Sequence, residues 1–309
     1  MNYTFSSPLL FLLLLGLFIL PEPTLAEHEQ DLENAATFLQ HQYNSTLQLC
    51  AEAPNAAPAV YWLWNDNYLA YAALIHYNET MAKAILATLE SYGFMKNYAY
   101  EALFGQPIEL PFREPKHYTI AEGAGYTIMF DVYNGSIMAD WKRHANLLCL
   151  AALSEHWQQN HTAALDYFNA AAAMWDGIGL CDAENPESED EGSRYYATYK
   201  LALLLYTEMI LGQSLSFHED AMNILWHLQN RTNYGIHTNY DTNYDPNGSD
   251  VNVETTSLVI GLFKWPEIFS HPTVSPTYEI GNNVAEIIIV SAVWTSLGSY
   301  LLWENRRRG

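Results

Sequence analysis

The two ends of the chain carry its longest apolar segments, and together they constrain where the residues between them can fold. Residues 8–20 are apolar apart from Gly16, and the small residues Thr24 and Ala26 follow them. This pattern is typical of a secretory signal that is cleaved after Ala26. Near the other end, residues 284–303 contain one charged residue, Glu286. That length is enough to cross a bilayer as a helix.

Three consecutive arginines, Arg306 to Arg308, follow the second apolar segment. Positive residues stay on the cytoplasmic side of a membrane helix, so both segments predict the same orientation. We expect a signal peptide over 1–26, an extracytoplasmic domain over 27–279, a transmembrane helix within 280–303 and a basic cytoplasmic stub over 304–309. The predicted location is the cell membrane, with a single pass. The alternative for the second segment is a buried core helix.

The chain is strongly acidic, with 35 acidic and 13 basic residues and a net charge of −22. Such a charge repels polyanions, which excludes nucleic acid as a partner. The alternative explanation of the acidity is an adaptation to salt, which would have no bearing on a partner. An exported chain can carry N-linked glycans at Asn-x-Ser/Thr sequences. Six of these follow the signal, at Asn44, Asn78, Asn134, Asn160, Asn230 and Asn247.

The chain has three cysteines, and export permits a disulfide bond between two of them. Cys149 lies within an apolar helical segment, so we expect it to be buried as a thiol. Cys50 and Cys181 lie in loop-like stretches and are the candidate disulfide pair. No Cys-x-x-Cys or Cys/His cluster predicts a zinc site.

Between the two ends, the apolar pattern predicts consecutive helical hairpins. In each pair the first helix is the more apolar and the second the more amphipathic. The expected helices cover 29–48, 65–77, 79–92, 138–158, 162–175, 194–211, 217–229 and 253–263. Three irregular stretches interrupt them, at 94–133, 177–193 and 232–252, and the first ends in the extended-looking sequence YTIMFDVY.

Pairs of this kind predict an all-α fold in which the apolar helices form an inner ring and the amphipathic helices surround them. We therefore expect an α/α toroid with irregular loop insertions. A plain helical solenoid is the alternative.

In such a ring the starts of the inner helices meet at one mouth, where paired carboxylates could cleave a glycosidic bond. Asp66, Asp250 and Glu254 are the candidate catalytic residues, because each stands at the start of an apolar helix. The alternative is that Asp66, Asp140 and Asn252 are only N-caps of their helices.

The same helix starts carry polar and aromatic residues suited to holding a sugar. The candidate substrate-binding residues are Trp62, Trp64, Asn67, Asp140, His144, Tyr195, Tyr196 and His237. The tryptophans have a second interpretation as core residues, and His144 as the hydrogen-bonded partner of a neighbour. His237 stands in a loop, where histidines are more often functional.

Oxygen-bearing side chains alternate from Asp241 through Asp245 to Ser249, which is the spacing of a calcium loop. Pro246 and Asn252 stand where an EF-hand needs Gly and Glu, so the loop is not an EF-hand. A cluster of turns is the preferred interpretation and an irregular calcium site at Asp241 and Asp245 the alternative. No other metal ion or cofactor is expected.

Two short segments resemble known α/α-toroid proteins. The sequence from Trp62 through Trp64 and Asp66 to Ala70 is similar to the entry segment of six-hairpin glycosidases. The sequence from Gly235 to Thr238, with the one from Asp250 to Leu258, is similar to a late segment of the wider group, which includes terpenoid-cyclase-like toroids. The resemblance implies an α/α toroid and candidate acids at Asp66 with Asp250 or Glu254. The DxDD motif of the cyclases is absent.

Two functions are consistent with these features. The first is a membrane-anchored, cell-surface carbohydrate-active protein, a glycoside hydrolase that uses paired carboxylates. The second is a non-catalytic surface module that binds a glycan or a protein partner. An enzyme needs two carboxylates that face one cleft, whereas a binding module needs only aromatic platforms.

Overall fold

The structure is a computed structural model that describes residues 25–93, 96–182, 195–246 and 248–270. Its longest helices are α2 (Leu25–Gln42), α4 (Glu79–Ser91), α5 (Ala145–Trp157), α6 (His161–Ala172), α7 (Thr198–Leu211), α8 (His218–His227) and α9 (Val253–Ser270). The six-residue helix α3 (Leu69–Leu74) continues directly from η1, a π-helical turn over Leu63–Tyr68. Two short 3₁₀ turns, η2 (Tyr100–Phe104) and η3 (Trp141–Arg143), complete the helical elements.

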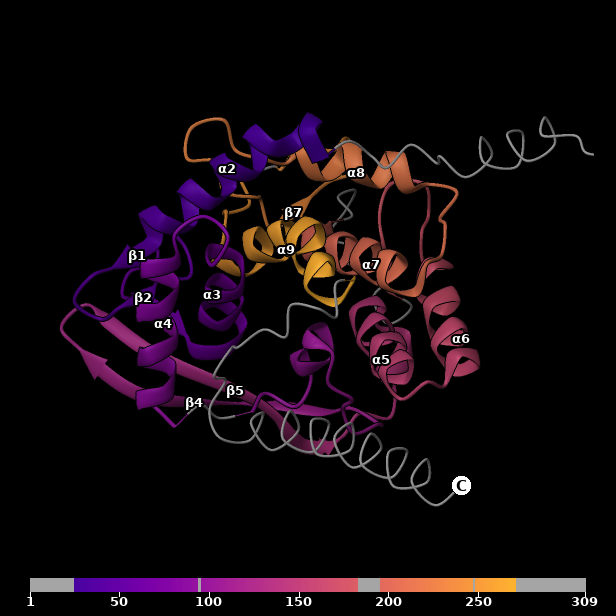
Figure 1. Ribbon diagram of the computed structural model, residues 1–309, viewed down its shortest axis with the longest axis horizontal. Helices are drawn as coiled ribbons and strands as arrows, with labels where there is room; N and C mark the ends of the chain where they lie inside the picture. The colour runs from indigo at the N-terminus through magenta and orange to yellow at the C-terminus, as the bar shows by residue number, and fades with distance from the viewer. Residues whose placement is uncertain (1–24, 94–95, 183–194, 247, 271–309) are drawn as a thin grey trace, which may run out of the picture.

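Helix α9 lies at the centre of the molecule and packs against α2, α3 and α7, while α7 also packs against α5 (Figure 1). Of these helices, α3, α5, α7 and α9 are apolar almost all round, which is what burial on most sides requires. Every residue from Leu201 to Tyr206 in α7 is at most 2% exposed. The amphipathic helices α4, α6 and α8 each follow a central helix in the chain and cover it from outside (Figure 1).

A three-stranded sheet lies along one side of the helices, below them in Figure 1. Its order is β3 (Ala59–Trp62), β5 (Tyr126–Ile137) and β4 (Arg113–Gly123). The middle strand β5 forms an antiparallel hairpin with β4, whereas β3 runs parallel to β5 and places Trp62 opposite Met129. Two smaller antiparallel pairs join β1 (Tyr43–Asn44) to β2 (Leu49–Cys50) and β6 (Tyr196–Ala197) to β7 (Asn239–Tyr240).

The prediction of an all-α toroid is wrong, because these sheets belong to the same core as the helices. Strand β5 buries Ile128, Phe130 and Val132 against the helices, so it is an integral layer and not a loop insertion. Each predicted helix overlaps an observed one, closely for 79–92 against α4 and less closely for 138–158, of which only Ala145–Trp157 is α-helical. The sheet was missed because β3 and β5 pair across more than sixty positions of sequence, which no local pattern reveals.

The predicted transmembrane helix has no counterpart in the described part of the chain. Among residues 25–270, less the gaps given above, no helix combines the length and the apolar character needed to cross a bilayer. The segment 284–303 lies outside the described residues, and so does most of the predicted signal peptide, of which Leu25 and Ala26 begin α2.

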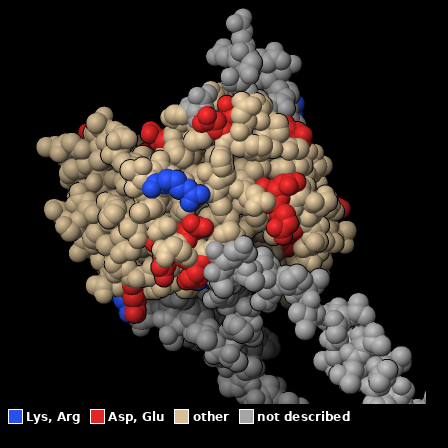
Figure 2. All heavy atoms as spheres, turned by 90° about the horizontal axis from the view of Figure 1, so that it is seen from above, with Lys and Arg blue, Asp and Glu red and all other residues tan. Residues whose placement is uncertain are grey.

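The acidic side chains lie in several separate groups on the face shown in Figure 2. Figure 2 shows one face of the molecule, on which Asp and Glu are spread widely and Lys and Arg are sparse. The excess of acids over bases in the sequence is therefore visible on this face.

Candidate active site

Three carboxylates from distant parts of the chain share one buried region between the sheet and the central helices. Asp66 comes from η1, Asp131 from β5 and Glu254 from the first turn of α9. Asp66 is 2% exposed and Asp131 is 3% exposed, whereas Glu254 is half-buried. The charges of Glu254 and Asp131 raise the pKa of Asp66, and the charge of Asp131 also raises the pKa of Glu254. The three carboxyl groups therefore interact electrostatically.

Asp66 is positioned by its neighbour Asn67, whose buried amide ties η1 to β2. The Asn67 Oδ1 accepts from the Cys50 N–H at 2.6 Å, and its Nδ2 donates to the Cys50 and Trp62 carbonyl oxygens at 3.0 and 2.8 Å. The chain then continues to Glu52, whose carbonyl oxygen accepts from the Val253 N–H at 2.9 Å. This contact places the start of α9, and with it Glu254, beside η1.

Asp131 is held by two side-chain amides. Asn65 donates to its Oδ2 at 3.0 Å, and Asn97 donates to its Oδ1 at 3.3 Å. His117 stands opposite Asp131 on β4. Burial raises the pKa of Asp131, while the Asn65 hydrogen bond and the charge of His117 act against that rise. Asp131 therefore has the most polar environment of the three acids.

Glu254 accepts a hydrogen bond from the Tyr100 hydroxyl at 2.6 Å. Burial, opposed by that hydrogen bond and assisted by the charges of Asp131 and Glu52, raises the pKa of Glu254 to about 7. Burial and then the charge of Glu254 raise the pKa of Asp66 well above its ordinary value. Both shifts favour the protonated form of the acid, and Glu254 is close to half ionised near neutral pH.

One oxygen of Asp66 has no hydrogen-bond partner. Its Oδ2 is buried and unpaired, which is costly for a polar group inside a protein. Asp66 does not cap a helix. The N-cap residues of η1 and α3 are Trp62 and Tyr68, and neither makes a side-chain capping hydrogen bond. The cap at α9 was predicted correctly, since Asn252 Oδ1 accepts from the Thr255 N–H at 2.9 Å.

Three tyrosines surround the carboxylates. Burial raises the pKa of Tyr100, Tyr133 and Tyr199, and the charge of Glu254 raises each of them further. Tyr133 and Tyr199 are half-buried, as are Glu52 and Glu254, and these residues form the more accessible side of the cluster. Asp66, Asp131 and Tyr100 form its buried side.

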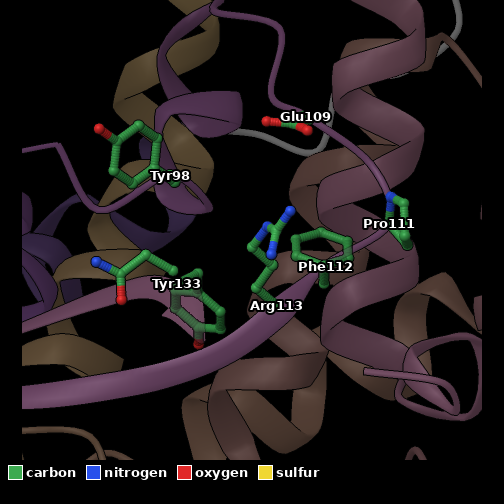
Figure 3. A pocket seen from close by; sticks show the side chains of 7 residues that line it. Tyr98, Glu109, Pro111, Phe112, Arg113 and Tyr133 are labelled. Carbon is green, nitrogen blue, oxygen red and sulfur yellow. The ribbon is translucent and has the colours of Figure 1, made fainter. Parts of the chain in front are cut away.

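An open cleft of about 380 Å³ adjoins the cluster at Tyr133 (Figure 3). Its walls are Tyr98, Glu109, Pro111, Phe112, Arg113, Tyr133 and Asn134. Tyr133 therefore belongs both to the cleft and to the surroundings of Glu254 and Asp131. None of the three acids lines the cleft, and Tyr133 is the residue that joins it to their surroundings.

The other predicted site residues are not part of this cluster. Asp250 is exposed, and its backbone carbonyl accepts from the Thr238 N–H in the preceding loop. His237 is held between the Ser249 carbonyl oxygen, 2.7 Å from Nδ1, and the Asn230 amide, 3.2 Å from Nε2. His237 therefore links Asn230 to Ser249 through its two ring nitrogens.

The predicted aromatic residues mostly belong to the core. Trp64 is 5% exposed and packs on Tyr68, while Tyr196 donates to Asp176 and stacks on Tyr240. Trp62 is half-buried with its ring edge-on to His117, and Tyr195 is 48% exposed. Neither residue lines the cleft of Figure 3.

At the start of α5 the structure shows an ion-pair network instead of a mouth. Asp182 Oδ1 accepts from the Ala145 N–H at 2.9 Å, and Oδ2 lies 2.5 Å from Lys200 Nζ and 3.3 Å from His144 Nδ1. His144 is thus the partner of an acid, but of Asp182 and not of Asp140. Asp140 makes no capping hydrogen bond at η3.

The predicted disulfide is absent: no bond joins Cys50 to Cys181 in the described part of the chain. Cys50 lies in β2, not in a loop, and its thiol faces the Leu39 carbonyl oxygen at 3.5 Å. Cys149 is fully buried in α5, as predicted.

The Asp241 loop is a set of turns. The Asp241 Oδ1 accepts hydrogen bonds from the Asn243 and Asp245 N–H groups at 2.7 and 3.1 Å, which is the pattern of an Asx turn. The residues that the structure describes include no group of three or more His, Cys, Asp or Glu side chains able to hold a metal ion.

Sequence reasoning missed Asp131 and all three tyrosines of the cluster. For Asp131 a signal was present, because it is a lone acid within the apolar sequence of β5, where an ionisable group needs a reason to be buried. The tyrosines carry no such signal.

Comparison of the chain with protein-family models, with curated proteins and with solved structures gave no match.

Proposed function

We propose that this protein is a glycoside hydrolase whose catalytic acids are Glu254 and Asp131. The observation that carries the proposal is the contrast between these two neighbouring carboxylates. Desolvation raises the pKa of Glu254 to about 7, whereas the pKa of Asp131, also raised by burial, is lowered by two amide donors that favour its ionised form. General acid catalysis of glycoside cleavage requires two neighbouring carboxyl groups, one of which holds a proton near neutral pH.

In this proposal Glu254 donates its proton to the oxygen of the leaving sugar as the glycosidic bond breaks. Asp131 is the ionised partner, which stabilises the positive charge that develops on the other sugar or activates the water that replaces the leaving group. Asp66 lies beside them with its pKa raised by burial and with one buried oxygen unpaired. The choice of a sugar as substrate also draws on the tyrosines around the acids and on the resemblance of the Trp62–Ala70 segment to glycosidases.

The test is cleavage of neutral polysaccharides by the purified full chain, measured as new reducing ends. Glu254→Gln and Asp131→Asn should each lower the rate by about 100-fold or more, since proton transfer supplies a factor of that size. Asp220→Asn is the matched control, because Asp220 is an exposed acid in α8, far from the cluster in the chain.

A folded wild-type chain that binds glycans and never cleaves them would contradict the hydrolase and favour a binding module. Equal rates in the wild type and both variants would also contradict the assigned roles. Circular dichroism of each variant checks that the lost rate is not lost folding.

A further inference from the structure

One short segment, residues 97–100, contributes both to the wall of the cleft in Figure 3 and to the carboxylate cluster. Asn97 donates to Asp131, and its carbonyl oxygen accepts from the Tyr133 N–H at 2.9 Å. Tyr100 donates to Glu254. Tyr98, between them in the chain, forms a wall of the cleft.

Tyr98 is held in an unusual conformation. Its φ of 72° lies in the left-handed region, which costs energy for a bulky residue without a glycine's freedom. The Asn97 Oδ1 accepts from the N–H groups of Ala99 and Tyr100 at 3.2 and 3.1 Å, and so fixes this turn. The result is an aromatic ring that is 53% exposed at the edge of the cleft. Strain of this kind persists where the surroundings enforce it, and it is concentrated at ligand sites.

The remaining walls supply polar groups of both signs. Glu109 offers hydrogen-bond acceptors and Arg113 offers donors, and both side chains are exposed. Arg113 is steadied by its hydrogen bond to the Gly135 carbonyl oxygen at 3.2 Å. The one acid and one base among the lining residues cancel, so the cleft itself carries no net charge, while the adjoining cluster is acidic. An anionic ligand is disfavoured by that cluster.

We infer that this cleft is a subsite for a neutral sugar ring, which stacks on Tyr98 and hydrogen-bonds to Glu109 and Arg113. The inference rests on the proposed function, because it takes the ligand of the cleft to be the substrate of the carboxylates. An aromatic face and a few placed polar groups are the usual composition of a small-ligand site, and the volume of the cleft falls within the usual range. The subsite would hold the part of an oligosaccharide that lies beyond the bond being cleaved.

The experiment measures binding separately from cleavage. Isothermal titration of the full chain carrying Glu254→Gln with neutral cello-, xylo-, manno- and malto-oligosaccharides should give binding to at least one series. Adding Tyr98→Ala should weaken that binding about tenfold, the loss expected when a central aromatic contact is removed. Tyr98→Phe should retain it, because the ring remains.

Tyr195→Ala is the matched control, since Tyr195 is 48% exposed and does not line the cleft. Equal affinity in Tyr98→Ala and Tyr195→Ala, or no binding of any of the four series, would overturn the subsite. Binding that depends on Tyr98 in a chain that never cleaves would support the subsite and sink the hydrolase. Cleavage whose kcat/KM is unchanged by Tyr98→Ala would sink the subsite and leave the hydrolase intact.

Discussion

The Tyr100 hydroxyl donates a hydrogen bond to Glu254 Oε1 at 2.6 Å, across 154 positions of sequence. This bond favours the ionised form of Glu254, whereas burial favours the neutral form. The pKa of about 7 is the result of that opposition. The bond therefore sets the pH at which the acid of the candidate site gains or loses its proton.

Removing this hydrogen bond should move the titration of Glu254 to higher pH. In Tyr100→Phe the ionised carboxylate loses its donor while burial remains, so its pKa rises further. The alkaline limb of the cleavage rate should follow it upward. Tyr206→Phe is the control, because Tyr206 is an equally buried tyrosine whose hydroxyl donates to the Leu103 carbonyl oxygen instead. Superimposable pH profiles for all three proteins would rule out this role of Tyr100.

Cleavage by the wild type should be lost as pH rises through about 7, because Glu254 must be protonated to act as the acid. The rate measured from pH 4 to 9 with a neutral oligosaccharide checks this. An alkaline limb that persists unchanged in a slow Glu254→Gln variant would assign the titration to another group.

Stability should depend on the same proton. The folded pKa of Glu254 is raised from 4.5 to about 7, so the folded state binds the proton more tightly than the unfolded state. The stabilisation is complete below about pH 4.5 and is lost as pH rises to about 7, by at most about 3 kcal/mol. Urea unfolding at pH 5 and pH 8 should show a smaller difference between the two pH values for Glu254→Gln than for the wild type.

The amide of Asn67 should be essential for folding stability. Asn67 is 0% exposed and makes three hydrogen bonds to backbone groups of β2 and Trp62. Asn67→Ala leaves those groups unpaired inside the protein, at a cost of about 2–4 kcal/mol. Asn223→Ala, an exposed change in α8, should stay within about 0.5 kcal/mol of the wild type. Comparable unfolding midpoints for the two variants would contradict the anchoring role.

The cysteines should differ in reactivity. Cys50 and Cys149 are fully buried, and burial raises the pKa of Cys149 to about 12, so both react slowly. Cys181 is only half-buried. Brief iodoacetamide treatment of the native chain should therefore modify Cys181 first, as peptide mass spectrometry can show. A Cys50–Cys181 peptide joined by a disulfide would refute the structural assignment and restore the sequence-based one.

Local patterns determined most of the helices. The apolar repeat in α5 and α7 and the amphipathic repeat in α4 and α8 each depend on neighbours three or four positions apart, so they are visible in the sequence. The same reasoning selected Asp66 and Glu254, because a charged residue at the start of an apolar helix needs an explanation. It also selected Asp250, which stands at an equivalent position in the sequence.

Only the tertiary structure separated these acids and completed the cluster. The path from Asn67 through Cys50 to the start of α9 brings Asp66 beside Glu254 and leaves Asp250 in solvent. Asp131 enters through the pairing of β5 with β3, which also overturns the all-α prediction. These contacts join residues far apart in the chain, and their energy comes from burial and from hydrogen bonds made only in the folded state. A local sequence pattern fixes which face of a helix is apolar, but not which distant carboxylate that face will meet.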